Sequence, residues 1–166
     1  PRRERMSAVY ALFGVVLTYY SSVRVLGDAS SALNMTALIG VANQLDPNVL
    51  KLAFIFMLVG YGTKVGLVPM HTWLPDAYSE APAPIAAMLA GVLETVAVYT
   101  VLRSKALVDQ ALPPEFTGNL LLTFGLLSFI VASLFMLIQH NYKRLFAYSS
   151  IEHMGLAMIG FGVGGM

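Results

Sequence analysis

The sequence predicts an all-α, polytopic transmembrane helix bundle, and its composition and charge spacing support that prediction. Of the 166 residues, 57% are hydrophobic and only 11% are charged, whereas a soluble domain carries about 25% charged residues. Eighteen uncharged residues separate Arg5 from Arg24, and twenty-seven separate Glu115 from Lys143. An apolar run of about 20 residues is long enough to cross the hydrocarbon core of a bilayer as a helix.

The same composition excludes several classes of protein. The low charge excludes an ordinary soluble enzyme, and a formal net charge of +1 provides no basic stripe, so we expect no nucleic-acid partner. The sequence contains no cysteine, which excludes disulfides, thiolate metal sites and iron–sulfur ligation by this chain. We therefore expect no cofactor or metal bound by the chain, and we expect the lipid bilayer to surround it.

Five membrane spans and two shorter helices are expected along the chain. The first span, about 6–26, is too long for the apolar part of a signal peptide and has no small-residue cleavage pattern after it. The next segment, about 30–45, is moderately apolar and is expected to be a short interfacial helix that Asp46-Pro47 ends. The other spans are expected at about 48–68, 84–102, 118–139 and 142–164, with a second short helix at about 69–78. Because the chain begins with Pro1 and has no initiator methionine, we expect a fragment.

Three of these spans place ionisable side chains near the middle of the membrane. At 1.5 Å per residue from the start of each span, Lys64 lies about 24 Å along its helix. Glu94, Glu152 and His153 lie about 15 Å along theirs. An ionisable group at the bilayer centre costs at least about 2.5–3.5 kcal/mol, so such groups face a bundle interior and usually serve ion or proton traffic. We therefore predict that these four residues form a proton relay.

Each of these residues has a structural alternative. Lys64 could instead snorkel to the near interface, and Glu94 could be a neutral carboxylic acid that is hydrogen-bonded within the core. Glu152 and His153 would be interfacial if their helix began late.

Residues around Lys64 predict a broken helix. Three glycines and a proline surround the lysine: Gly60, Gly62, Gly66 and Pro69. Non-helical backbone at membrane depth survives only where protein or water lines it, and many transporters build ion sites at such breaks.

Three further residues are expected to support the relay. His71 and Asp76 lie on the short helix after the break, and Ser149 lies one turn before the Glu152-His153 pair. An amphipathic interfacial belt is the alternative for His71 and Asp76.

Several stretches of the sequence resemble a known family. The stretches GYGTKVGLVPMHTWLPDAYSEAP (60–82), LAGVL (89–93) and YTVLR (99–103) resemble the antiporter-like, proton-translocating membrane subunits of respiratory complex I and its hydrogenase relatives. The stretch KRLFAYSSIEHMG (143–155) is most similar to the hydrogenase-4 component F branch. Quinone-reductase subunits usually have Ser-Gln where this chain has Glu152-His153.

The resemblance implies a fold of about fourteen helices with two inverted five-helix repeats, of which this chain would hold the later part of the first and the start of the second. It also implies that Lys64 is the central proton-carrying lysine of the family. The glutamate that the family pairs with this lysine would fall before or within residues 1–6, where Glu4 does not align. Thr95, beside Glu94, takes the place of the family's next lysine or histidine.

The function that the resemblance implies is proton translocation in a membrane-bound hydrogenase of the hydrogenase-4 or formate hydrogenlyase type. The chain would lie in the inner (plasma) membrane of a bacterium or archaeon and carry no redox centre itself. Nickel–iron and iron–sulfur centres would lie in partner hydrogenase subunits, and protons or sodium ions would be the cargo. A quinone-reductase or cation/proton antiporter subunit is the alternative within the family, and a passive membrane scaffold is the alternative outside it.

Overall fold

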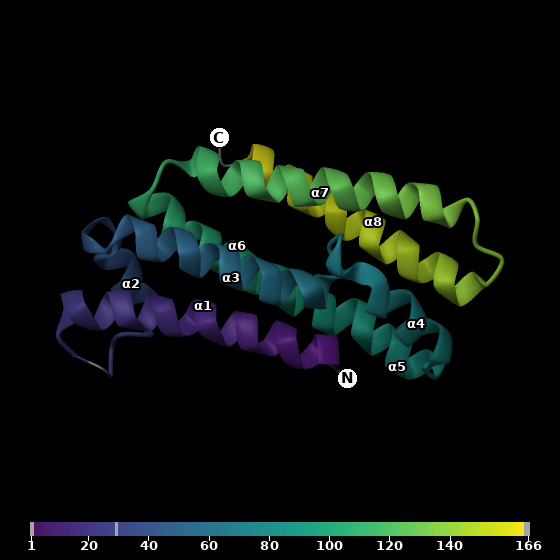
Figure 1. The fold of residues 1–166 in the computed structure, drawn as a ribbon, viewed down its shortest axis with the longest axis horizontal. Coiled ribbons are helices and arrows are strands. Elements are labelled where there is room, and N and C mark those ends of the chain that lie inside the picture. The colour runs from purple at the N-terminus through teal and green to yellow at the C-terminus, as the bar shows by residue number, and fades with distance from the viewer. Residues whose placement is uncertain (1, 29, 165–166) are drawn as a thin grey trace. The chain divides into compact units, whose positions relative to one another are not determined.

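The computed structural model describes residues 2–28 and 30–164, with side chains from Met6 onward, so the expectation for Glu4 lies outside the described side chains. The described residues form helices and no strand, which confirms the all-α prediction (Figure 1). The α-helices are α1 (Arg2–Leu26), α2 (Met35–Gly40), α3 (Pro47–Val65), α4 (Trp73–Glu80), α5 (Ala83–Met88), α6 (Glu94–Ala111), α7 (Pro114–Met136) and α8 (Tyr142–Val163). Three short elements join them: the 3₁₀ turns η1 (Ala42–Gln44) and η2 (Met70–Thr72), and the π-helical turn η3 (Leu89–Leu93).

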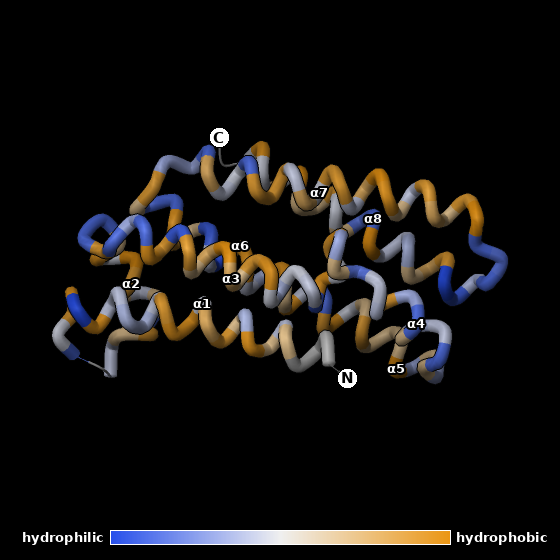
Figure 2. The backbone as a smooth tube through the Cα atoms, in the orientation of Figure 1, coloured by the Kyte–Doolittle hydropathy of each residue, from blue (hydrophilic) through white to orange (hydrophobic). Residues whose placement is uncertain are grey.

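Four helical stretches of the described residues are long and apolar enough to cross a membrane. They are Met6–Leu26, Pro47–Glu80, Ala83–Ala111 and Pro114–Met136, and they overlap the first four expected spans. Helix α8 has 22 residues, but its composition is more mixed than that of α7, as Figure 2 shows. The expected fifth span at 142–164 therefore stays a prediction.

Several helix bounds differ from those expected. The single helix expected at 30–45 is instead a short α2 followed by η1. The helix expected to end at residue 102 continues to Ala111, and Lys105 pairs with Asp109 one turn later within this extension. The short helix after the break continues to Glu80.

The chain forms two compact units. The first unit holds the residues up to Tyr61 together with Thr100–Thr117. Within it, α1 and α3 approach closely at glycines: a Cβ on Gly60 would lie 2.5 Å from the Ala11 nitrogen, and one on Gly14 would lie 2.9 Å from the Ala53 oxygen. Small residues of this kind let transmembrane helices pack backbone to backbone.

The second unit holds Gly62–Tyr99 and the residues from Gly118 onward. Helices α7 and α8 meet at Gly125 and Gly155, where a Cβ on either glycine would lie within 2.9 Å of the other's carbonyl oxygen. A hydrophobic cluster joins α4 to these two helices; its buried members are Leu74, Tyr78, Ala132, Ala147 and Ile151. This packing fixes α8, which carries the predicted relay residues Glu152 and His153.

Candidate functional site

The predicted break in the helix lies at Gly66, directly after the end of α3. Gly66 has a φ of +85°, a left-handed conformation that glycine adopts without the steric cost that a Cβ brings. The N–H groups of Gly66 and Leu67 donate to the Gly62 carbonyl at 3.0 and 2.8 Å. These two bonds cap the helix, so α3 stops one residue after Lys64.

Side chains satisfy backbone groups that the break leaves free. The indole Nε1–H of Trp73 donates to the Thr63 carbonyl at 2.6 Å, and the Val68 N–H donates to the Ser128 hydroxyl at 2.9 Å. Without such partners, a buried backbone group away from water would destabilise the protein. The broken segment is therefore held by protein contacts on both sides of Gly66.

Lys64 lies in the last turn of α3 and is half-buried. The carbonyl end of a helix carries partial negative charge, which attracts a cationic side chain. No ion pair joins Lys64 to a carboxylate among the described side chains. The structure thus confirms the helix break beside this lysine, while its role in proton transfer stays a prediction.

Glu94 is fully buried, and two hydroxyl groups hold its carboxyl group. Tyr78 on α4 donates its phenolic hydrogen to Oε1 at 2.6 Å, and Ser150 on α8 donates to Oε2 at 3.0 Å. A buried carboxyl group without hydrogen-bond partners would destabilise the fold strongly. The packing of α4 and α8 in the second unit supplies both partners.

A π-helical turn immediately precedes Glu94. Such turns insert one extra residue into a helix and often lie at functional sites. The insertion rotates the residues before Glu94 relative to it. Ala87 and Gly91 are accordingly exposed while Glu94 is buried, although the spacing of a regular α-helix would place all three on one face.

Glu152 and His153 point to different partners, and they do not form a bonded pair with each other in the structure. The Ser133 hydroxyl on α7 donates to Glu152 Oε1 at 2.8 Å. His153 is exposed, and its Nδ1 lies 2.6 Å from the Ser149 carbonyl oxygen and 3.4 Å from the Ser149 hydroxyl. Ser149 is thus a neighbour of His153, whereas Glu152 is connected to α7.

Asp76 and His71, two of the predicted supporting residues, both contact α8. Asp76 pairs with Arg144 of α8 at 2.6 Å, and the His71 ring lies 6.4 Å from the Tyr148 ring between centroids. Pro69 is exposed and precedes η2. A Cβ on Gly62 would meet nothing closer than 3.3 Å, so its role is to accept the capping bonds at the break rather than to permit a close approach.

Sequence reasoning missed the hydroxyl groups that bind the Glu94 and Glu152 carboxyl groups. Tyr78, Ser150 and Ser133 each contact a glutamate that lies on another helix. The sequence has no local signal for these contacts, because they depend on which helices pack together. No group of three or more His, Cys, Asp or Glu side chains within the described part of the chain could hold a metal ion.

Comparison with known proteins identifies the protein family of the chain. Residues 4–166 match the family described as NADH:quinone oxidoreductase/Mrp antiporter, transmembrane. The chain belongs to this family of multi-pass membrane proteins. This agrees with the resemblance seen in the stretches around Lys64 and Glu152.

Particular relatives lie in more than one branch of the family. The chain is 47% identical over 155 residues to the hydrogenase-4 component F homolog of Methylacidiphilum infernorum, covering 93% of this chain and 33% of the relative. It is 37% identical over 163 residues to NAD(P)H-quinone oxidoreductase chain 4 of Gloeobacter violaceus, covering 94% of this chain and 28% of the relative.

A solved structure shares the fold. It is that of the membrane-bound sulfane sulfur reductase, an archaeal respiratory membrane complex, and the match has a TM-score of 0.82 with 29% sequence identity. The match covers 94% of this chain and 30% of that one. The chain therefore spans about a third of the length of the curated relatives and of the solved chain that it matches.

Proposed function

We propose that this chain is part of a proton-translocating membrane subunit in a membrane-bound hydrogenase of the hydrogenase-4 or formate hydrogenlyase type. One observation carries the proposal: the Glu94 carboxyl group is fully buried within an apolar helical stretch and is bound by hydroxyl groups of two other helices. Family membership and the 47% identity to a hydrogenase-4 component F homolog support it.

The hydroxyl groups around Glu94 suit a carboxyl group that gains and loses a proton. When Glu94 is a carboxylate, Tyr78 and Ser150 both donate to it. When it is protonated, its own O–H can donate to one of these hydroxyl oxygens, because a hydroxyl group accepts as well as donates and rotates freely. Both protonation states of Glu94 therefore have hydrogen-bond partners without movement of a helix.

The proposed relay consists of Lys64, Glu94, Glu152 and His153. Lys64 lies beside the helix break, where the carbonyl end of α3 attracts a cationic side chain. Glu152 has a hydroxyl partner in Ser133, which can serve either form of that carboxyl group in the same way. His153 contributes an exposed imidazole, whose ring nitrogens can both donate and accept hydrogen bonds.

The redox chemistry would lie in other subunits. We expect nickel–iron and iron–sulfur centres in partner hydrogenase subunits, with the complex in the inner membrane of a bacterium or archaeon. The relatives are named as a component of a hydrogenase and as a chain of a quinone oxidoreductase, which supports membership of a multisubunit complex. We propose protons as the cargo.

The test uses the full-length protein in its complex, in inverted membrane vesicles energised with hydrogen. Lys64→Met and Glu94→Gln should each lower proton uptake, measured with a pH-sensitive dye, by about tenfold or more, since a positioned proton donor typically contributes about 10²–10⁴-fold. Lys64→Arg should fail to restore uptake, because a guanidinium does not release its proton. Assembly, measured by the yield of purified complex, should stay close to that of the unmodified protein.

Glu80→Gln is the matched control, because Glu80 is an exposed carboxylate on α4 and lies outside the proposed relay. It should leave proton uptake unchanged. Uptake that is unaffected by both Lys64→Met and Glu94→Gln would contradict the relay and favour a passive scaffold.

A subunit of a quinone oxidoreductase is the second candidate, and the 37% identity to NAD(P)H-quinone oxidoreductase chain 4 favours it. The two candidates differ in the electron donor that drives proton uptake. Proton uptake driven by NADH and not by hydrogen would favour the quinone oxidoreductase subunit. The proposed relay residues are the same for both candidates.

A further inference from the structure

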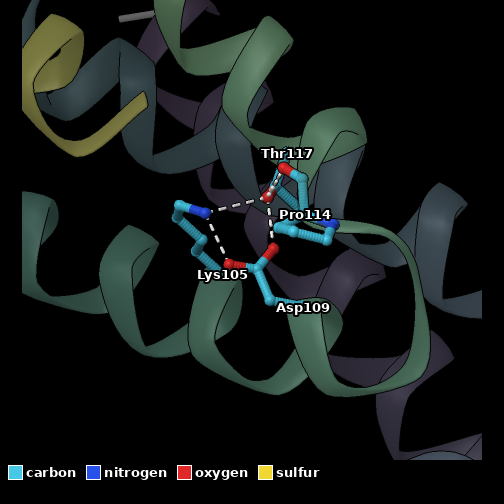
Figure 3. Close-up of polar contacts among 4 residues, drawn as sticks. All are labelled: Lys105, Asp109, Pro114 and Thr117. Carbon is cyan, nitrogen blue, oxygen red and sulfur yellow. Dashed lines mark hydrogen bonds and ion pairs between the residues drawn. The ribbon is translucent and has the colours of Figure 1, made fainter. Parts of the chain in front are cut away.

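A second polar cluster lies in the first unit, where α6 ends and α7 begins (Figure 3). The Lys105 ammonium donates to Asp109 Oδ2 at 2.5 Å and to the Thr117 hydroxyl at 3.1 Å. The Thr117 hydroxyl also bonds to Asp109 Oδ1, so the three side chains close a ring. Lys105 is 7% exposed and Thr117 is fully buried, whereas the Asp109 side chain is 21% exposed.

Packing alone does not require this ion pair. Removing two charges from water is costly, and apolar residues of similar volume often stabilise a fold as well as a buried ion pair does. Both residues lie near the C-terminal end of the long helical stretch Ala83–Ala111, beyond the expected span at about 84–102, and Lys105 is nevertheless almost fully buried. A functional role would explain why this buried position holds an ion pair and not apolar residues.

The Thr117 hydroxyl has one hydrogen but two acceptors within reach. These acceptors are Asp109 Oδ1 and the Pro114 carbonyl, which lies 3.2 Å from the hydroxyl oxygen. A serine or threonine hydroxyl rotates to suit its neighbours and can accept a hydrogen bond while it donates another. Thr117 can therefore donate to Asp109 or, with its hydrogen turned toward Pro114, accept a hydrogen bond from Asp109.

We propose that Asp109 is an additional proton-exchanging residue of this subunit, with Lys105 as its counter-ion and Thr117 as its hydrogen-bond switch. Asp109 accepts a proton from water at its exposed edge, the new O–H donates to the Thr117 oxygen, and Thr117 turns its own hydrogen to the Pro114 carbonyl. Loss of that proton reverses each step, so no bond other than the O–H is formed or broken. The inference rests on the proposed proton-translocating function.

The test measures assembly and proton uptake of the full-length protein in its complex, in the vesicles described above. Thr117→Val removes the hydroxyl and leaves the ion pair, and Thr117→Ser is the matched control that keeps the hydroxyl. The double variant Lys105→Met/Asp109→Asn removes both charges, so it avoids an unpaired buried ion. Glu94→Gln in the same vesicles reports on the proposed function separately.

We expect Thr117→Val and the double variant to assemble normally but to lower proton uptake about tenfold, a modest part of the contribution of a positioned proton donor. Thr117→Ser should match the unmodified protein. Normal uptake by the assembled double variant would overturn the proposal and make the pair a structural contact, and normal uptake by Thr117→Val would overturn the role of the hydroxyl as a switch.

The Glu94 variant separates this inference from the proposed function. Loss of uptake in Glu94→Gln, with normal uptake in the Thr117 and double variants, would overturn this inference alone. Normal uptake in all of them, Glu94→Gln included, would contradict the proposed function as well.

Discussion

Helix α6 carries one carboxyl group near each end, and the two are stabilised in different ways. Glu94, at its start, is bound by the hydroxyl groups of Tyr78 and Ser150. Asp109, in its last turn, is bound by the ammonium of Lys105 and by one hydroxyl. A carboxyl group bound by hydroxyls can change its charge without leaving an opposite charge unpaired. A proton gained by Asp109 costs more, because Lys105 then lacks a counter-ion and keeps only its hydrogen bond to the Thr117 hydroxyl.

This difference decides how each site responds to substitution. Loss of one member of a buried ion pair leaves a charge in a poorly solvated place. Loss of a hydroxyl-bound carboxyl group leaves only neutral hydroxyls without acceptors, which costs less. The comparison therefore predicts an order of stabilities, which can be measured.

The largest effect is expected for Asp109→Asn. Lys105 would remain almost fully buried without its counter-ion, and breaking a buried ion pair in this way lowers the free energy of unfolding by about 3–5 kcal/mol. Lys105→Met should cost less, because Asp109 is partly exposed. The double variant should recover most of the loss. Thermal unfolding of the purified protein in detergent measures all three, and a double variant no more stable than Asp109→Asn would contradict this explanation.

A smaller effect is expected for Glu94→Leu. The Tyr78 hydroxyl would lose the acceptor of its 2.6 Å hydrogen bond, and an unsatisfied buried donor costs about 1–3 kcal/mol. Glu94→Gln should cost less than Glu94→Leu, since its amide oxygen still accepts a hydrogen bond. The same unfolding measurement tests the order. Equal stability of the leucine and glutamine variants would show that the hydroxyl bonds do not stabilise this region.

The smallest effect is expected for Asp76→Asn. Its ion pair with Arg144 is short, at 2.6 Å, but the aspartate and arginine side chains are 69% and 45% exposed. An exposed ion pair contributes about 0–1 kcal/mol. A loss of stability comparable to that of Asp109→Asn would show that burial does not explain the difference between the two ion pairs.

The helical class and the break at Lys64 could be predicted from the sequence because each depends on local chemistry. An apolar segment that crosses a membrane forms a helix, because its backbone groups must be hydrogen-bonded within the segment. Gly66 ends α3 with a positive φ, a conformation that suits glycine. The buried position of Glu94 also followed from one charge within an apolar run. These features need no knowledge of which helices pack together.

The partners of Glu94 could not be predicted in this way. Tyr78 and Ser150 reach it through the packing of separate helices, and the π-helical turn before it changes which residues share its face. Lys105 and Asp109 have a helical i, i+4 spacing that is visible in the sequence. Because the expected span ends at residue 102, it does not include either residue, and the pair is not predicted.

The hydrogen bond from Trp73 to the Thr63 carbonyl has an optical consequence. Trp73 is the only tryptophan in these 166 residues, and its indole is hydrogen-bonded to the last turn of α3, next to the helix break. Selective excitation of the indole in this chain would therefore give a fluorescence signal from the break itself. If the segment around Gly66 rearranged, the indole would lose its hydrogen bond to the Thr63 carbonyl and enter a different environment. The wavelength of its fluorescence emission would then shift, and no added label would be needed.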